Sequence, residues 1–386
     1  MQGIRALGIA GLIATTPAMA LDQGDYQFNG FGTAGLTHLG GEDKGRSFGI
    51  RGQTTDAWRG DQLSRLGGQL QYGLTDTLGV TVQGTLKPEQ DTWKGNLEWA
   101  YLSWKATEGL TVRAGRLRLP IYMYSETLDV GVTHPWLRLP DEVYSQVQLS
   151  NYEGADALYT VTTGIGSVTF QVAGGQAANR NLFAMDDLYD IDYKKIFAAN
   201  VSLETYDFGT LRLGYAEADI DTNLSASVVA PGGSPTQVDF LSLNRKKGRF
   251  ASIGYQYDNG SWVSSNEWTS NNTEGDQQGS IDAFYLMGGR RFGDVLLHLT
   301  YAHLDEDAGR QSSWTYGVNY NLAPNLVLKG EYKRVDTLGN GYRGTFVQNA
   351  QETFDHAVFA ASNGTAGTPS RNYDGDIVSV GVDFVF

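Results

Sequence analysis

Apolar residues alternate with small or polar residues in many segments of about ten positions along this chain. In one segment Val168, Phe170 and Val172 are separated by polar residues. The last segment carries apolar side chains at every second position from Val378 to Phe386. A period of two is the pattern of β-strands whose two faces meet different surroundings. Helical periodicity is rare, so the pattern predicts an all-β fold.

The connections between these segments alternate between short turns and long polar stretches. The seven short turns are rich in Gly, Asp, Asn and Pro and lie at residues 75–77, 107–109, 164–166, 207–209, 258–260, 292–294 and 322–325. The long stretches lie near residues 41–60, 87–95, 117–149, 175–194, 217–247, 270–280, 304–311 and 336–374. This spacing predicts sixteen antiparallel strands with all short turns at one end. A β-sandwich has no reason to sort its connections this way, whereas a transmembrane β-barrel has short periplasmic turns and long outer loops.

Aromatic residues lie at many of the predicted strand ends. Phe, Trp and Tyr make up 12% of the chain. Those on the predicted outer face include Tyr72, Tyr159, Tyr206, Tyr215, Tyr257, Trp262, Phe292 and Tyr320. An amphipathic ring is favoured at the level of the lipid headgroups, where barrels carry aromatic girdles. The alternative is that these rings belong to the core of a soluble protein.

Residues 1–20 have the layout of a secretory signal peptide. Arg5 precedes an apolar run over residues 6–14, and an Ala-x-Ala cleavage site ends at Ala20. The other interpretation is a buried N-terminal helix. No later stretch stays apolar over the roughly 18 residues that a membrane-spanning helix needs. We therefore expect an exported chain whose mature part, residues 21–386, is one barrel.

The composition argues against several classes of function. The chain has no cysteine, which excludes thiolate catalysis, iron–sulfur clusters and zinc sites built from cysteine. Its formal net charge is −14 and it has no basic patch with interleaved aromatic residues, so nucleic acid is not an expected partner. The five histidines are scattered and no hydrolase or phosphate-loop motif is present, so we expect no catalytic residue and no cofactor. Asp219, Asp221 and Asn223 match the first ligands of a calcium loop, but the Gly and the distal Glu of that loop are missing, and no metal site is expected.

With these features the chain resembles the Gram-negative outer-membrane porins over its whole mature length. The matching features are sixteen strands, a signal peptide and a last strand that ends in Phe386. The resemblance implies a water-filled channel for passive diffusion of small hydrophilic solutes, in a membrane of lipid and lipopolysaccharide. It also implies a homotrimer, and a terminal aromatic residue that serves as a signal to the barrel-assembly machinery. No short motif in the chain is specific for one solute.

In the porin family the third outer loop folds into the barrel and narrows the channel. Here that position is the segment from Leu117 to Leu149, which holds three of the nine prolines and several apolar residues. A loop surrounded by water does not need those residues, so we expect a packed loop inside the lumen. The alternative is an outer lid packed on its own side chains. The Pro-Glu-Phe-Gly-Gly stretch common in this loop of general porins is absent.

Charged residues on this loop and on the facing wall are the candidates for the pore constriction. They are Glu126, Asp129, Asp141 and Glu142 on the loop, Arg65 and Arg113 on strand positions that face inward, and Arg116 and Arg118 where the loop begins. Acids facing arginines across a narrow pore produce a transverse field that orients dipolar solutes. Lys329, Glu331 and Lys333 also share a predicted inward face.

The charge balance favours a weak preference for cations. Without Arg5 the 29 basic residues become 28, against 43 acidic ones, and acidic outer loops enrich cations at the mouth of a pore. The inward arginines and the run Arg245-Lys246-Lys247 favour an anion path instead. A porin selective for phosphate or another anion is therefore the nearest alternative. A barrel enzyme or adhesin with a plugged lumen is the alternative from another class.

Overall fold

A computed structural model describes residues 21–42, 44, 47–48, 53–54, 57–89, 92–230, 232–275, 280–307, 309–339, 349–366 and 374–386. The expected signal peptide, residues 1–20, lies outside the described residues. The strands of the barrel are β1 (Tyr26–Gly40), β4 (Arg65–Thr75), β5 (Leu78–Glu89), β6 (Thr92–Lys105), β7 (Leu110–Arg118), β8 (Asn151–Thr163), β9 (Gly166–Ala184), β10 (Asp187–Thr205), β11 (Gly209–Val229), β12 (Pro235–Asp258), β13 (Trp262–Thr273), β14 (Ser280–Phe292), β15 (Val295–Glu306), β16 (Gly309–Ala323), β17 (Leu326–Gly339) and β18 (Gly375–Val385). The other elements are the short strands β2 (Ser47–Phe48) and β3 (Gln53–Thr54), the 3-10 helices η1 (Ser125–Thr127) and η2 (Gly131–Thr133), and the helices α2 (Asp141–Tyr144) and α3 (Ala350–Ala361).

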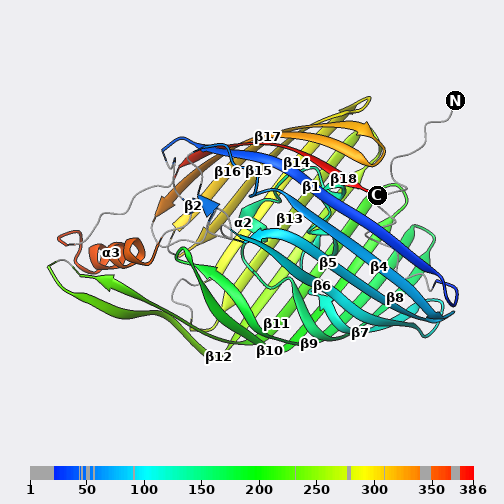
Figure 1. The fold of residues 1–386 in the computed structure, drawn as a ribbon, viewed down its shortest axis with the longest axis horizontal. Helices are drawn as coiled ribbons and strands as arrows, with labels where there is room; N and C mark the ends of the chain where they lie inside the picture. The colour runs from blue at the N-terminus through cyan, green and yellow to red at the C-terminus, as the bar shows by residue number, and fades with distance from the viewer. Residues whose placement is uncertain are drawn as a thin grey trace.

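The sixteen long strands close into one antiparallel barrel in chain order, with β1 beside β18 (Figure 1). The closing pair runs from Phe31 opposite Val385 to Gly40 opposite Asp376. Closure gives the backbone groups of every strand a partner, which a sheet in lipid requires. All seven predicted turns join neighbouring strands, from β4–β5 to β16–β17. The predicted sixteen-stranded barrel is confirmed.

Several stretches predicted as long loops are extensions of strands. β9 and β10 stay paired as far as Ala184 and Asp187, inside the predicted loop 175–194. β11 and β12 pair over much of the predicted loop 217–247, with register shifts that mark bulges. Each extension carries charged residues between buried apolar ones such as Ile191, Ile220 and Leu243, so its sequence is more polar than that of the strands below it. The hairpin of β11 and β12 extends to the same end of the molecule as α3 (Figure 1).

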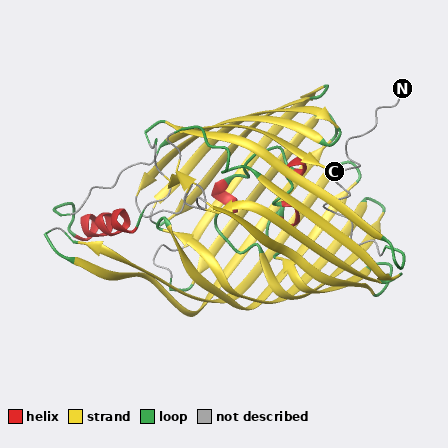
Figure 2. Cartoon of the chain, viewed as in Figure 1, coloured by secondary structure: helices red, strands yellow, loops and turns green. Residues whose placement is uncertain are grey.

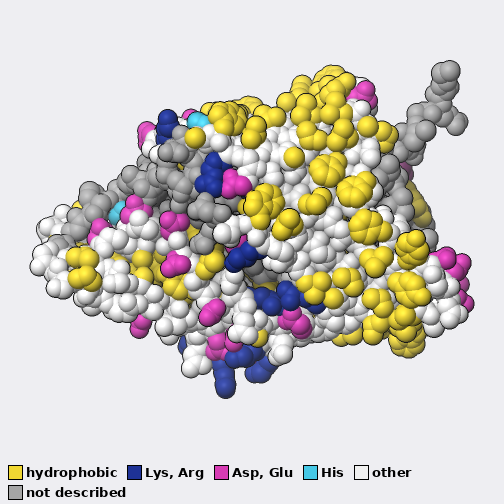
Figure 3. All heavy atoms as spheres, in the orientation of Figure 1, with side chains coloured by type: hydrophobic (Ala, Val, Ile, Leu, Met, Phe, Trp, Pro, Cys, Tyr) yellow, Lys and Arg dark blue, Asp and Glu magenta, His cyan; other side chains and the backbone are white. Residues whose placement is uncertain are grey.

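The apolar face of the strands points away from the lumen. Seven of the eight aromatic residues predicted for the outer face are exposed, and Tyr257 is half-buried. On the inner face Gln69, Thr81 and Gln83 are buried. Figure 3 shows hydrophobic side chains over one half of the barrel and most charged side chains toward the other end. Among the described helices, none combines the length and apolar character needed to cross a membrane.

The third loop, residues 119–150, lies inside the barrel and contains η1, η2 and α2 (Figure 2). Ile121, Trp136 and Val143 of this loop are at most 1% exposed and pack in one apolar cluster with inward residues of the wall such as Tyr285. The inward-folded loop is therefore confirmed. The alternative of an outer lid packed on its own side chains is wrong.

Candidate pore constriction

The third loop is fixed to one side of the lumen by its polar groups. The backbone N–H of Met123 donates to Glu267 Oε1 on β13 at 2.8 Å. The indole N–H of Trp136 donates to Thr300 Oγ1 on β15 at 2.8 Å. On β12 a Cβ added to Gly254 would come within 3.1 Å of Met123 Sδ, so glycine lets the loop approach the wall closely.

Lys329 on β17 makes the densest set of these contacts. Its Nζ donates to the carbonyl oxygens of Gly131, His134 and Trp136 at 2.8, 2.7 and 3.2 Å, and lies 2.6 Å from Asp383 Oδ2. The side chain is 2% exposed. One buried ammonium therefore joins three carbonyls of the loop to the wall.

Two of the predicted constriction acids, Asp141 and Glu142, face the same wall. Both are buried at the start of α2, and Lys333 Nζ lies 3.2 Å from Asp141 Oδ2 and 3.3 Å from Glu142 Oε2. Gln311 Nε2 also donates to Glu142 Oε1 at 2.7 Å. These two carboxylates hold the loop to β16 and β17, on the side of the lumen away from Arg113.

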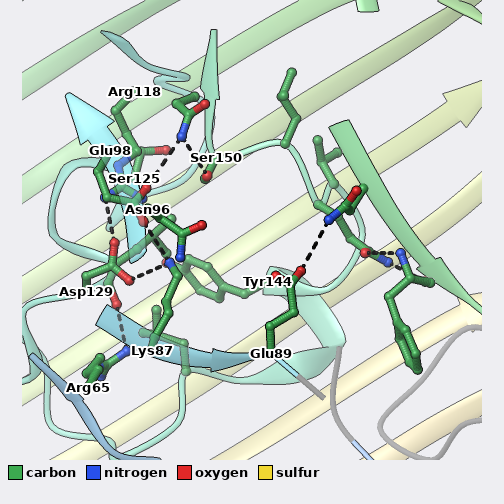
Figure 4. A pocket seen from close by; sticks show the side chains of 18 of the residues that line it. Arg65, Lys87, Glu89, Asn96, Glu98, Arg118, Ser125, Asp129, Tyr144 and Ser150 are labelled. Carbon is green, nitrogen blue, oxygen red and sulfur yellow. Dashed lines mark hydrogen bonds and ion pairs between the residues drawn. The ribbon is translucent and has the colours of Figure 1, made fainter. Parts of the chain in front are cut away.

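Asp129 joins the opposite edge of the loop to β5, β6 and β7. Lys87 Nζ is 3.2 Å from Asp129 Oδ1, and Arg118 Nη2 is 2.6 Å from Asp129 Oδ2. Glu98 completes an alternating network, 2.9 Å from Lys87 and 3.7 Å from Arg118. Burial alone would raise the pKa of Asp129, but Lys87 and Arg118 hold it far below its usual range. Figure 4 shows these four side chains gathered beside Arg65.

Glu126 is the most exposed of the four loop acids in its side chain, at 28%. Its Oε1 lies 3.8 Å from Arg113 Nη2. The guanidinium of Arg113 is already engaged by the buried Asp156, which accepts from Nε at 2.9 Å and from Nη2 at 2.5 Å. Gln171 Nε2 donates to Asp156 Oδ2 as well, at 2.8 Å. Glu126 therefore faces a cation whose charge is largely balanced.

The two remaining predicted arginines also lie near this edge of the loop. Arg65 Nη1 donates to the carbonyl oxygen of Leu128 at 3.3 Å, and Arg116 Nη1 lies 3.1 Å from Glu153 Oε1. Both line a cavity of about 460 Å³ together with Arg118, Asp129 and Asp141. Glu126, Arg113 and Glu142 are not among its lining residues. The fold thus divides the predicted site residues between an anchored wall, an ion-paired edge and a cavity.

The sequence reasoning missed Lys87, Glu98 and Asp156. Asp156 lies directly opposite Arg113 in the pairing of β7 with β8, so the strand register was the signal that points to it. The sequence predicts a loop at 87–95, which includes Lys87, and gives no signal for Glu98, whereas the structure places them on β5 and β6.

Two of the residues that match part of a calcium loop, Asp219 and Asp221, are paired with lysines. Asp219 Oδ2 is 2.8 Å from Lys195 Nζ, and Asp221 Oδ2 is 2.7 Å from Lys194 Nζ. In the described part of the chain no group of three His, Cys, Asp or Glu side chains is placed to hold a metal ion.

Solved structures with the same fold include several outer-membrane proteins. The trimer form of in-vitro folded OmpT from Vibrio cholerae has a TM-score of 0.56 and 14% identity, covering 95% of this chain and 100% of that chain. An anion-selective porin from Comamonas acidovorans has a TM-score of 0.58 and 14% identity, with 94% and 100% covered. The outer-membrane channel DcaP of Acinetobacter baumannii has a TM-score of 0.58 and 11% identity, with 94% and 98% covered. At these identities the likeness is one of fold.

The family assignment comes from the sequence. No curated protein sequence matches the chain. A family model described as Gram-negative porin matches residues 6–340, which is most of its length. The chain belongs to the Gram-negative porins and is an outer-membrane channel for passive diffusion.

Proposed function

We propose that this porin passes small hydrophilic solutes and ions between the third loop and the wall of β4–β9, with a weak preference for cations. The loop's contacts with β13, β15 and β17 support this route, because they hold the loop to that side of the lumen, and its contacts with the opposite side are with charged residues such as Lys87. On this route a solute passes Glu126 of the loop and Arg113 of the wall, while Asp129 and Arg65 line the cavity beside them.

The preference for cations rests on the unequal balance of the two partners at Glu126. Arg113 donates from two nitrogens to Asp156. Glu126 keeps 28% of its side chain exposed and lies 3.8 Å from Arg113. A carboxylate in a narrow, low-dielectric passage raises the local concentration of cations. The field is screened over about 10 Å at 0.1 M salt and about 3 Å at 1 M, so the preference should shrink as salt rises.

The test is the reversal potential of single channels in a salt gradient. The wild-type channel should give the sign of weak cation preference, and Glu126→Gln should move the potential toward anions. Asp129→Asn should move it in the same direction, although it also leaves Lys87 and Arg118 with Glu98 as their one carboxylate partner among the described residues. Glu108→Gln, an equal loss of charge at an exposed periplasmic turn, serves as the control and should change the potential little.

A channel that prefers anions is the second candidate. It is favoured by Arg65, which has Thr33 Oγ1 and the Leu128 carbonyl oxygen, both neutral, as its acceptors at 3.3 Å. The Comamonas acidovorans porin of the same fold is described as anion-selective. A clearly anion-selective wild-type channel would establish this reading and overturn the preference for cations.

Assembly and export belong to the same proposal. Residues 1–20 act as a cleaved signal peptide, residues 21–386 form the barrel, and the barrel-assembly machinery recognises Phe386. The mature barrel is a homotrimer in contact with lipid and lipopolysaccharide, and it catalyses no reaction. The trimer form of Vibrio cholerae OmpT supports the oligomeric state. A monomer mass in mild detergent would contradict it.

A further inference from the structure

The cavity of about 460 Å³ lies toward the outer end of the barrel. Its lining takes in Lys87 and Asn96, near the tip of the β5–β6 hairpin, and Arg180 and Phe183, near the tip of the β9–β10 hairpin. Six of the described lining residues are cationic and four are acidic. Apolar side chains from the loop and from the β9–β10 hairpin, among them Leu149 and Phe183, line it as well.

Four of these ten charges balance one another. Lys87 and Arg118 are matched by Glu98 and Asp129, as described above. The acid Glu89 is paired with Lys94 at 2.9 Å. These pairs leave no excess charge for a solute to meet.

Arg65 has neutral acceptors, as described above, whereas Arg116 and Arg180 share one carboxylate. Glu153 Oε1 lies 3.1 Å from Arg116 Nη1 and 2.6 Å from Arg180 Nη2. Glu153 is itself outside the cavity lining, and its side chain is 44% exposed. Two guanidinium groups and one carboxylate carry a net positive charge where the cavity meets β7 and β9.

Both arginines also keep donors without an acceptor. The Nε of Arg116 and the Nε of Arg180 are buried and have no hydrogen-bond partner. The described residues give Arg116 one acceptor, Glu153 on Nη1, although a guanidinium has five N–H donors. A hydrogen bond from an arginine to a carboxylate is charge-assisted and stronger than one between neutral groups, so a carboxylate is the ligand that this pair of arginines favours.

The backbone is irregular immediately before each arginine. Gly115 has φ +140°, and an added Cβ would meet the carbonyl oxygen of Ala100, so only glycine fits there. Asn179 has φ 52° beside a register shift between β9 and β10. Irregularities of this kind re-aim the next side chain out of the regular alternation. Two strands thus depart from regular geometry where they present Arg116 and Arg180 to one cavity.

We propose that Arg116 and Arg180 form a binding site for the carboxylate of an organic anion, whose apolar body lies against Leu149 and Phe183. The inference rests on the diffusion path proposed above, because the cavity is the outer approach to that path. Small ions cross with the preference set at Glu126, while this site retains an organic acid at the mouth.

The experiment is calorimetry on barrel refolded in detergent without lipopolysaccharide, with cyclohexanecarboxylate as the probe. The carboxylate should bind, and the neutral cyclohexanecarboxamide should bind at least about tenfold more weakly, since it lacks the charge that the arginines need. Arg116→Gln and Arg180→Gln should each weaken binding about tenfold. Arg116→Lys keeps the charge without the fork and should fall between wild type and Arg116→Gln.

The control is Arg249→Gln, which removes an arginine paired with Glu274 at 3.1 Å outside the cavity and should leave the affinity unchanged. Equal binding of acid and amide by the wild type overturns the inference even if a variant fails to fold. Loss of the carboxylate signal on adding lipopolysaccharide also overturns it, because the site then belongs to a lipid phosphate. Conductance of the same preparation tests the channel separately, so a conducting barrel without binding refutes this site alone.

Discussion

Replacing Lys329 with Met should loosen the third loop inside the barrel. The ammonium group of Lys329 reaches three loop carbonyls within 3.2 Å and Asp383 Oδ2 at 2.6 Å. Methionine has a similar length and fills the same space but donates nothing. The loop would then keep its apolar packing and lose the cation that ties residues 131–136 to β17.

The loss of folding stability follows from the carboxylate of Asp383, which remains buried. Asp383 is 0% exposed, and without Lys329 it retains the hydroxyl of Thr33, which donates at 2.5 Å, and the charge of Arg65 without a direct ion pair. Removing one partner of a buried ion pair costs about 3–5 kcal/mol, because the other charge stays in place without compensation. Converting Asp383 to Asn in the same chain removes that charge. The double variant should therefore recover part of the loss, with a coupling energy of about 2 kcal/mol.

The assay is denaturant unfolding of the reconstituted barrel, followed by tryptophan fluorescence and paired with single-channel recording. Lys329→Met should lower the free energy of unfolding and increase open-channel noise, and Lys329→Met with Asp383→Asn should lower stability less. Lys195→Met is the matched control, because Lys195 is 82% exposed and its pair with Asp219 is worth at most about 1 kcal/mol. Equal stability and equal noise in Lys329→Met and Lys195→Met would refute the role given to Lys329.

Two further predictions concern the seam and the loop as a whole. Deleting Phe386 should reduce the yield of heat-modifiable barrel in membranes far more than it changes conductance, because the backbone of Phe386 closes the seam with two hydrogen bonds to Gly30, of 2.7 and 2.9 Å. Phe386→Ala keeps these backbone bonds and so separates the effect of the ring from that of the seam. A normal yield from the deleted chain would contradict the prediction. Replacing residues 121–142 with a short Gly/Ser link should raise single-channel conductance, because the loop packs across the lumen, and unchanged conductance would mean that it does not obstruct the path.

The barrel could be predicted from the sequence because lipid requires an apolar outer face on every strand, which makes apolar residues alternate with polar or small ones. Val380 is 44% exposed on the outer face while its neighbours Ser379 and Gly381 are buried inside, as the alternation required. That requirement ends where the membrane ends. In the paired outer parts of β9–β12 many charged residues lie between the few buried apolar ones, such as Ile191, Ile220 and Leu243, so these segments were predicted as loops.

The candidate site was predictable in parts that follow from strand geometry. Alternation placed Arg113 on the inner face, and its partner Asp156 lies opposite it in the register of β7 and β8. The path of a loop has no such periodicity. Asp129 finds its partners on β5 and β7, and Glu142 finds its partners on β16 and β17. Both sets of partners depend on how the loop crosses the lumen.

This difference bears on any argument from charge counts. Four acids on one loop suggest a strongly acidic constriction, yet Lys333 contacts two of them, and Lys87 and Arg118 contact a third. Only Glu126 keeps a substantial part of its side chain exposed, opposite an arginine already bound to Asp156. The field that an ion meets depends on charges that lack a close counter-charge, so the proposed preference for cations rests on Glu126 alone, and Arg65 with its neutral acceptors opposes it. This is why Glu126→Gln should move the reversal potential more than the neutralisation of Asp141, whose charge lies beside Lys333 on the opposite wall.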